Sequence, residues 1–173
     1  MTPGDFLKDI LAPGLAWFEQ NVGFVPPASR EARLLLLAIA GQESNWENVA
    51  QGGGGPGRGP WQFEPETCRE ILFNPATEAM ATKVCMALNV VPSRSYDALM
   101  IYPNLAVAFG RLDLWANPHP LPPYGNENAG YKYYLDTWRP GSPYRPRWAA
   151  VYPQALAADR AWAAGAMNQE AKP

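Results

Sequence analysis

The sequence predicts an all-α domain with one hydrophobic core. Along most of the chain, apolar residues recur at three- and four-residue steps, as on one face of a helix. No segment shows the apolar–polar alternation or the turn dipeptides typical of strands and hairpins. Apolar residues make up 47% of the 173 residues, enough to fill one core. The 19 prolines indicate short helices joined by stiff loops.

The first helix is expected over residues 3–21, interrupted by Pro13 and Gly14. Ser29 is the expected N-cap of the next helix, because its hydroxyl can accept a hydrogen bond from a free backbone N–H. Residues 34–40 are too apolar for a surface helix. We therefore expect the buried central helix of the domain here, ending within residues 41–45.

The later part of the chain predicts further helices and one long loop. Residues 51–60 consist mostly of glycine, which has no side chain to pack and great backbone freedom, so this segment can only be a loop. In the clearest of the later helices, four large apolar side chains between Leu105 and Trp115 share one face. The later helices are expected over residues 65–72, 75–89, 104–115, 126–138 and about 147–167.

The charge and the apolar pattern argue against two classes of protein. The net charge of −2 gives no concentrated basic face for nucleic acid. No apolar run approaches the roughly 20 residues of a membrane span. Asp5, Lys8 and Asp9 stand where a secretory signal would form its apolar stretch. We expect synthesis in the cytoplasm without a signal peptide, and no insertion into a membrane.

Two cysteines, Cys68 and Cys85, are too few for a disulfide framework. A single bridge between them is one interpretation. Two buried apolar thiols are the favoured one.

Glu43 is the residue best placed for chemistry. It lies at the C-terminal end of the most apolar predicted helix, shortly before the glycine-rich loop. Apolar surroundings favour the neutral carboxyl, which raises its pKa and suits it to donate a proton near neutral pH. Cleavage of a glycosidic bond needs such a donor on the leaving oxygen. By position alone, an ordinary glutamate at a helix end is an equally good interpretation.

Other kinds of site find no support in the sequence. The glycine-rich loop lacks the Gly-Lys-Ser/Thr of a phosphate-binding loop and follows a helix rather than a strand. His119 is the only histidine and stands between two prolines, a poor position for a nucleophile's base. No cysteine and histidine cluster has metal-ligand spacing. An enzymatic function is therefore expected to need no cofactor and no metal.

Two motifs resemble those of the lytic transglycosylases (SLT-type) of the lysozyme superfamily. The first motif of that family is Glu-Ser, found here as Glu43 and Ser44. After a loop the family has Gly-Leu-Met-Gln-Ile, and Gly-Pro-Trp-Gln-Phe stands in its place at residues 59–63. Pro65 and Thr67 match the Pro-x-Thr that follows in the family. The resemblance implies a lysozyme-like (SLT or goose-type) helical fold with the glycine-rich loop at the active site.

The resemblance also implies roles for particular residues. Glu43 would protonate the glycosidic oxygen between N-acetylmuramic acid and N-acetylglucosamine, then act as base toward the muramic acid 6-hydroxyl. The product would be a 1,6-anhydro sugar, formed without water. Ser44 would help to hold Glu43, while Gln62, Phe63 and Trp61 would line the sugar groove.

The sequence departs from the family pattern in two places. Pro60-Trp61 replaces the family's Leu-Met, and the third motif, Ala-Tyr-Asn-Ala-Gly, has only Asn-Ala-Gly-Tyr at residues 128–131 as a counterpart. Helical spacing puts Tyr131, Tyr134 and Trp138 on one face. Aromatic rings with polar tips suit sugar binding. We expect Tyr131 and Tyr134 in the groove and Trp138 in the core.

Two alternative functions remain open. A hydrolytic muramidase would need a second carboxylate, for which Asp97 and Glu64 are candidates, although each also fits an ordinary solvated charge. A non-enzymatic virion or tail protein could keep a lysozyme-like fold for docking, and the departures from the family motifs favour it. The presence of Glu43, Ser44 and Gln62 together argues against a purely structural role.

The Trp-Arg-Pro-Gly sequence at residues 138–141 resembles phage-encoded members of the superfamily. It implies an endolysin released through a holin, or a virion component, acting on the periplasmic cell wall after synthesis in the host cytoplasm. The expected partner is the glycan strand of peptidoglycan, together with other virion or tail proteins if the chain is a virion component. The expected parts are an N-terminal helical extension (1–29), the catalytic domain (30–141) and a C-terminal helix with a frayed end from Asn168 (142–173).

Overall fold

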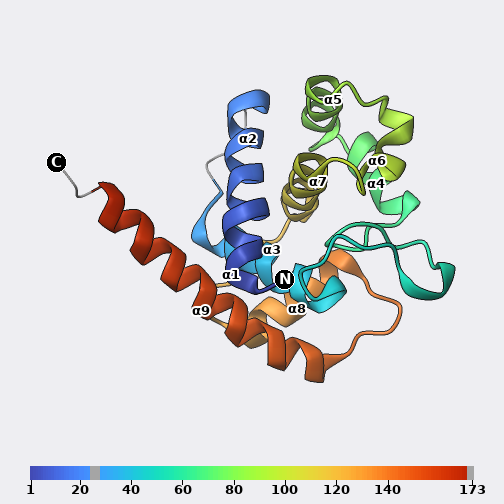
Figure 1. Cartoon of the computed structure of the whole chain (residues 1–173). Helices are drawn as coiled ribbons and strands as arrows, with labels where there is room; N and C mark the ends of the chain where they lie inside the picture. Colours follow the sequence, from blue (N-terminus) through green and yellow to red (C-terminus); the bar gives the residue numbers. More distant parts are fainter. Residues whose placement is uncertain (24–27, 171–173) are drawn as a thin grey trace.

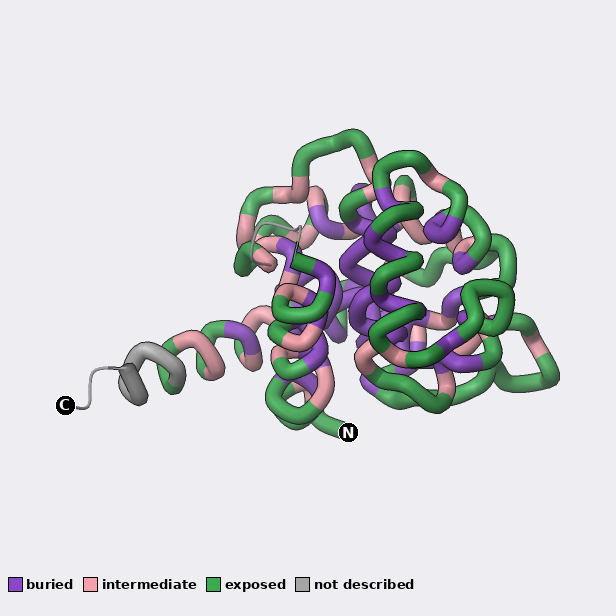
Figure 2. The backbone as a smooth tube through the Cα atoms, turned by 90° about the horizontal axis from the view of Figure 1, so that it is seen from above, coloured by how far each residue is buried: buried purple, intermediate pink, exposed green. Residues whose placement is uncertain are grey.

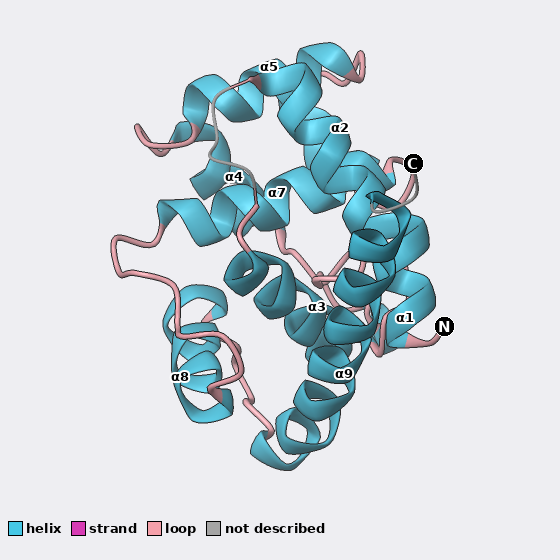
Figure 3. Ribbon diagram, turned by 90° about the vertical axis from the view of Figure 1, so that its left-hand side faces the viewer, coloured by secondary structure: helices cyan, strands magenta, loops and turns pink. Residues whose placement is uncertain are grey.

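The computed structural model describes residues 1–23 and 28–170 and contains helices and loops (Figure 1). Within those residues the only strand-like pairings are isolated bridges of Ala50 with Arg58 and of Arg58 with Phe63. Figure 3 accordingly shows no strand. The all-α prediction is confirmed.

The predicted helices are present, with ends shifted by up to three residues, and three short elements were not indicated by the sequence pattern: η2, η3 and α6. The elements in order are α1 (Pro3–Phe6), η1 (Leu7–Leu11), α2 (Ala12–Val22), α3 (Arg30–Ser44), η2 (Gly52–Gly54), α4 (Pro65–Phe73), α5 (Glu78–Ala87), η3 (Pro92–Arg94), α6 (Ser95–Ala98), α7 (Pro103–Ala116), α8 (Glu127–Trp138) and α9 (Arg145–Glu170).

The interruption expected at Pro13 and Gly14 is a widened turn rather than a break. The π-helical turn η1 comes just before Pro13, which has no N–H and would otherwise crowd the carbonyl one turn earlier. Gly14 has a different role. A Cβ at this position would come within 2.7 Å of the Val107 side chain, so glycine allows α2 and α7 to cross closely.

Helix α3 lies in the middle of the molecule, between α7 and α9 (Figure 3). Ser29 is its N-cap, as predicted, and the Ser29 hydroxyl accepts a hydrogen bond from the Ala32 N–H at 3.3 Å. Every residue from Leu34 to Gln42 is buried, which confirms the central buried helix. Asn45 ends the helix in the left-handed conformation, with φ of 56°.

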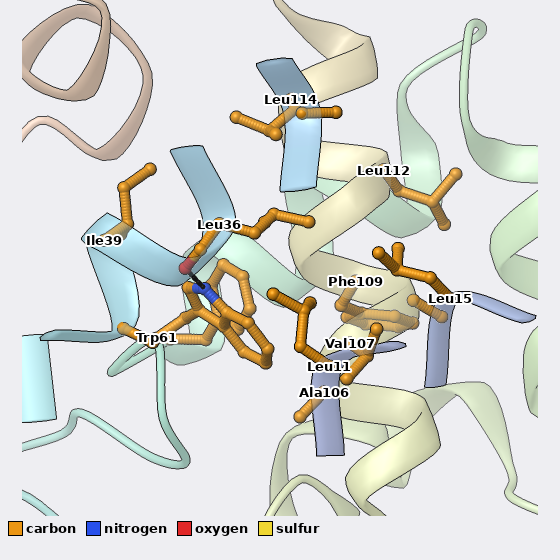
Figure 4. Close-up of a cluster of buried hydrophobic side chains, with 14 of the residues drawn as sticks. Leu11, Leu15, Leu36, Ile39, Trp61, Ala106, Val107, Phe109, Leu112 and Leu114 are labelled. Carbon is orange, nitrogen blue, oxygen red and sulfur yellow. Dashed lines mark hydrogen bonds between the residues drawn. The ribbon is translucent and has the colours of Figure 1, made fainter. Parts of the chain in front are cut away.

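A single cluster of buried side chains includes both ends of the chain. Phe6 and Leu11 from the N-terminal helices and Trp148 from α9 belong to the same cluster as α3 and α7. Figure 4 shows its centre, where the Trp61 indole donates a hydrogen bond to the Leu36 carbonyl at 3.0 Å. The boundaries expected after residues 29 and 141 therefore do not separate cores.

A buried ion pair holds α9 against α3. The Asp159 side chain, which is 1% exposed, accepts hydrogen bonds from Arg33 Nε at 2.5 Å and from the Tyr124 hydroxyl at 2.8 Å. Trp162, one turn further on, still packs against Arg33, and the C-terminal part of α9 then extends away from the body of the molecule (Figure 2). The helix continues to Glu170, past the predicted start of fraying, and residues 171–173 lie outside the described residues.

Cys68 and Cys85 are both buried free thiols, as the favoured interpretation had it. Burial is the main reason why the pKa of the Cys68 thiol rises to about 12. No helix in the described part of the chain combines the length and the apolar character needed to cross a membrane.

Candidate active site

The C-terminal end of α3 opens into a cleft of about 790 Å³. Three loop segments contribute to its walls: residues 49–52, residues 62–64 and residues 139–144. The helices α4, α8 and α9 complete the walls. Segments far apart in the sequence therefore meet around the last turn of α3, where Glu43 lies.

The Glu43 carboxyl is mostly buried in the wall of this cleft, where the Tyr134 hydroxyl donates a 2.6 Å hydrogen bond to its Oε1. Burial raises the pKa of Glu43 above its ordinary value, and this effect exceeds the opposing effects of the Tyr134 hydrogen bond and the Arg147 charge. The pKa of the Tyr134 phenol is also raised, first by burial and then by the Glu43 charge, so Tyr134 remains a donor. Glu43 is therefore suited to hold and release a proton.

Ser44 joins the end of α3 to the loop that follows it. Its Oγ lies 2.9 Å from the Pro60 carbonyl and 3.0 Å from the Ala40 carbonyl, and it accepts a hydrogen bond from the Glu47 N–H at 3.1 Å. These contacts fix the last turn of α3, and with it the backbone of Glu43. This position suits the holding role that the resemblance implies for Ser44.

Gln62 lies in the cleft wall and braces the glycine-rich loop. Its side-chain nitrogen donates to the carbonyls of Val49 at 2.9 Å and Gly59 at 2.8 Å. Both N–H groups of the amide are used in this way, which leaves the carbonyl Oε1 as the acceptor that a ligand could reach. A Cβ at Gly57 would come within 2.7 Å of this Oε1, so a side chain there would displace the Gln62 amide.

Phe63 and Trp138 form a stacked pair in the cleft wall, with ring centroids 5.7 Å apart and planes at 27°. Trp138 was expected in the core: it packs against the core, but it is only partly buried and also lines the cleft. As the last residue of α8, it has no following helical turn to cover it. Its indole nitrogen donates to the Trp61 carbonyl at 3.1 Å, joining α8 to the loop.

Trp61 and Tyr131, both expected in the groove, lie outside the cleft lining. Trp61 is 0% exposed and packs edge-on against Phe6, so it supports the loop from the core and cannot touch a ligand. Tyr131 packs beside Tyr134, with centroids 5.9 Å apart, and the Arg145 guanidinium lies 4.7 Å from the centre of its ring. Only Tyr134 of the two tyrosines reaches the cleft.

Sequence reasoning missed Arg147 and Gln42. Arg147 comes from the start of α9, outside the segment that carries the family resemblance, and its guanidinium donates to the Gly41 carbonyl at 3.2 and 3.3 Å. Gln42 donates to the Tyr144 carbonyl at 3.4 Å, while its own Oε1 is buried without a hydrogen-bond partner. The position of Gln42 directly before Glu43 could have indicated that it lies at the site. Nothing in the sequence around Arg147 indicates that this residue reaches the cleft.

Of the two carboxylates considered as a second catalytic group, Glu64 lines the cleft and Asp97 does not. Asp97 lies on α6 in an exposed ion pair with Arg94 at 3.3 Å. Glu66 and Glu70 also line the cleft, and each pairs with an arginine. Glu64 is thus the remaining candidate from the sequence.

No three histidine, cysteine, aspartate or glutamate side chains come together as metal ligands among residues 1–23 and 28–170. Comparison with protein-family models, with curated proteins and with solved structures found no match to this chain. The interpretation of the cleft therefore depends on its own geometry and on the two motifs around it.

Proposed function

We propose that this protein is a lytic transglycosylase with a lysozyme-like fold, which cleaves the glycan strands of peptidoglycan with Glu43 as its acid and base. The observation that carries the proposal is the Glu43 carboxyl itself. Burial raises its pKa, the Tyr134 hydroxyl orients it, and it lies in a cleft of about 790 Å³ with an aromatic wall. The Glu-Ser and Gly-Pro-Trp-Gln-Phe motifs flank that cleft and add their resemblance to it.

The reaction needs one carboxyl acting twice. Neutral Glu43 gives its proton to the glycosidic oxygen as the bond from that oxygen to C1 of the muramic acid breaks. The Glu43 carboxylate then takes the proton of the 6-hydroxyl as O6 bonds to C1, which closes the anhydro ring and restores neutral Glu43. Between the steps, the Tyr134 hydrogen bond and the Arg147 charge stabilise the carboxylate.

A hydrolytic muramidase is the second candidate, because Glu64 lines the same cleft. There Glu64 would activate a water or attack C1 directly, and the product would carry a reducing end.

Digestion of purified peptidoglycan, with the products identified by mass spectrometry, tests the proposal. We expect muropeptides lighter by one water than the hydrolysis products. Reducing ends of full mass would instead establish the muramidase. A folded protein that released neither product would contradict both enzymatic functions and favour a structural virion protein. The phage origin and the route to the cell wall remain predictions from residues 138–141.

Tyr134→Phe should change the pH profile of cleavage in a specific direction. The Tyr134 hydrogen bond lowers the pKa of Glu43, so its removal raises that pKa further. Glu43 then keeps its proton to higher pH, and the alkaline limb of the kcat profile moves to higher pH. At the optimum, kcat should fall by about tenfold, because the carboxyl loses one charge-assisted hydrogen bond.

Tyr131→Phe is the matched control, since Tyr131 lies beside Tyr134 but outside the cleft lining. Its profile should overlay that of the wild type. An alkaline limb that stays in place in Tyr134→Phe, or moves to lower pH, would show that Tyr134 does not act on Glu43 in this way.

A further inference from the structure

A second hollow, of about 690 Å³, adjoins the cleft along α4. The two share Glu66, Glu70 and Arg139 in their walls, so a ligand can extend from one into the other without leaving the surface. Arg69 and Phe73 line the second hollow and not the cleft.

The walls of this hollow carry paired charges of both signs. Glu66 and Arg69, both on α4, form an ion pair at 2.7 Å. Arg139, directly after α8, pairs with Glu70 on α4. The Arg69 and Glu66 side chains are 65% and 60% exposed. Exposed pairs of this kind contribute only about 0–1 kcal/mol, so their charges can exchange partners readily with a charged ligand.

Phe73 gives the hollow an apolar contact. Its side chain is 70% exposed at the end of α4, so its ring is accessible to a ligand in the hollow. A ligand for this hollow therefore combines charges of both signs with apolar groups.

The substrate proposed above has such a part. With the lactyl carboxyl of muramic acid in amide linkage to the peptide, its alternating N-acetyl sugars carry no charge, so they offer hydroxyl and amide groups but no partner for ion pairs with four charged side chains. The peptide attached to the lactyl group of muramic acid carries carboxylates, an amine and methyl groups, and it branches from the sugar that lies at the cleaved bond.

We propose that the second hollow binds the peptide stem of peptidoglycan while the glycan strand lies in the cleft, an inference that rests on the proposed function. Arg69 and Arg139 bind peptide carboxylates, as guanidinium groups do with two parallel hydrogen bonds. Glu66 and Glu70 accept from the peptide amine. Phe73 packs against the apolar groups of the stem.

Binding without turnover tests the inference directly. A Glu43→Gln protein is titrated in a calorimeter with a glycan tetrasaccharide that carries its peptides and with the bare tetrasaccharide, in which the lactyl carboxyls are capped as uncharged amides. We expect the peptide-bearing ligand to bind about tenfold or more tightly, which is the effect of one charge-assisted contact. Adding Arg69→Ala should remove this advantage and leave the affinity for the bare tetrasaccharide unchanged.

Arg94→Ala is the matched control, because Arg94 is also an exposed arginine in a pair three residues apart, with Asp97, and lies outside both hollows. The Arg94→Ala protein should still bind the peptide-bearing tetrasaccharide more tightly than the bare one, by the same factor as before. Equal affinity for the two ligands, or an advantage that survives both Arg69→Ala and Phe73→Ala, would overturn the inference.

Cleavage by the wild type separates this inference from the function on which it rests. The two tetrasaccharides are supplied to the wild type in parallel. Faster cleavage of the peptide-bearing strand is expected. Equal rates would overturn the peptide site and leave the transglycosylase standing, whereas no cleavage of either would overturn the proposed function itself.

Discussion

Glu43→Gln is expected to reduce peptidoglycan cleavage by about 10²–10⁴-fold, which is the usual contribution of a positioned acid or base. The amide matches the carboxyl in shape, and its oxygen can still accept the Tyr134 hydrogen bond. It can neither donate an acidic proton to the leaving oxygen nor take one from the 6-hydroxyl. The rate of product release by mass spectrometry gives the loss, and the midpoint of thermal unfolding shows that the fold is intact.

Two further glutamate variants complete this test. Glu47→Gln is the matched control, because Glu47 is exposed a few residues along the chain and lies outside the cleft lining. It should cleave at the wild-type rate. Glu64→Gln should retain most activity in a transglycosylase and lose it in a muramidase. Full activity of Glu43→Gln would remove the proposed mechanism altogether.

Asp113→Asn is expected to change how stability depends on pH. Asp113 lies on α7 with one carboxyl oxygen buried and unpartnered, and burial raises its pKa from 3.8 to about 7. The Arg139 charge opposes this shift and the Glu70 charge adds to it. A carboxyl that is harder to ionise in the folded state favours folding at low pH and opposes it at high pH.

The sign follows from proton binding in the two states. Below pH 3.8 the Asp113 carboxyl is neutral in both, and its contribution to stability is complete. As the pH rises toward about 7, the unfolded chain ionises while the folded protein keeps its proton, so stability falls until the folded group also ionises. A shift of this size corresponds to about 4 kcal/mol.

Urea unfolding of the wild type and Asp113→Asn at pH 4, 5.5 and 8 measures this effect. Relative to the wild type, the free energy of unfolding of the variant should rise by about 4 kcal/mol from pH 4 to pH 8, because asparagine does not ionise. Asp136→Asn is the control for the same substitution at an exposed site, since Asp136 lies in an exposed pair with Lys132 at 3.2 Å. A constant difference for Asp113→Asn would mean that this carboxyl is ionised in the folded protein throughout.

The helices could be predicted from the sequence because their signals are local. Ser29 caps α3 through a bond to a residue three positions away, and the apolar run after it leaves no exposed face. Glu43 could be identified as a candidate acid because its signal is also local: the apolar run at residues 34–40 comes shortly before it in the chain. The turn at Pro13 was located correctly, while its π-helical form depends on how the carbonyls rearrange around the proline ring.

The motifs also led to Gln62 and Phe63, and helical spacing to Tyr134, all of which line the cleft. The other residues of the cleft could not be predicted, because spacing gives the face of a helix and not what that face contacts. Tyr131, Tyr134 and Trp138 share a face of α8, yet only the last two reach the cleft. The motif placed Trp61 in the groove, but its side chain is buried in the core, where the indole donates a hydrogen bond to the Leu36 carbonyl. Arg147 reaches the site from more than 100 residues away in the chain, through the packing of α9 on α3.

Two residues of the cleft wall adopt the left-handed backbone conformation without being glycine: Gln62 and Arg139, with φ of 49° and 47°. Each such residue costs on the order of 1 kcal/mol or more, and the surrounding contacts must hold it there. Glycine at these two positions would remove this backbone cost, but it would give up the Gln62 hydrogen bonds to the Val49 and Gly59 carbonyls and the Arg139 charge. The cleft is thus a place where the fold gives up backbone stability to keep particular side chains.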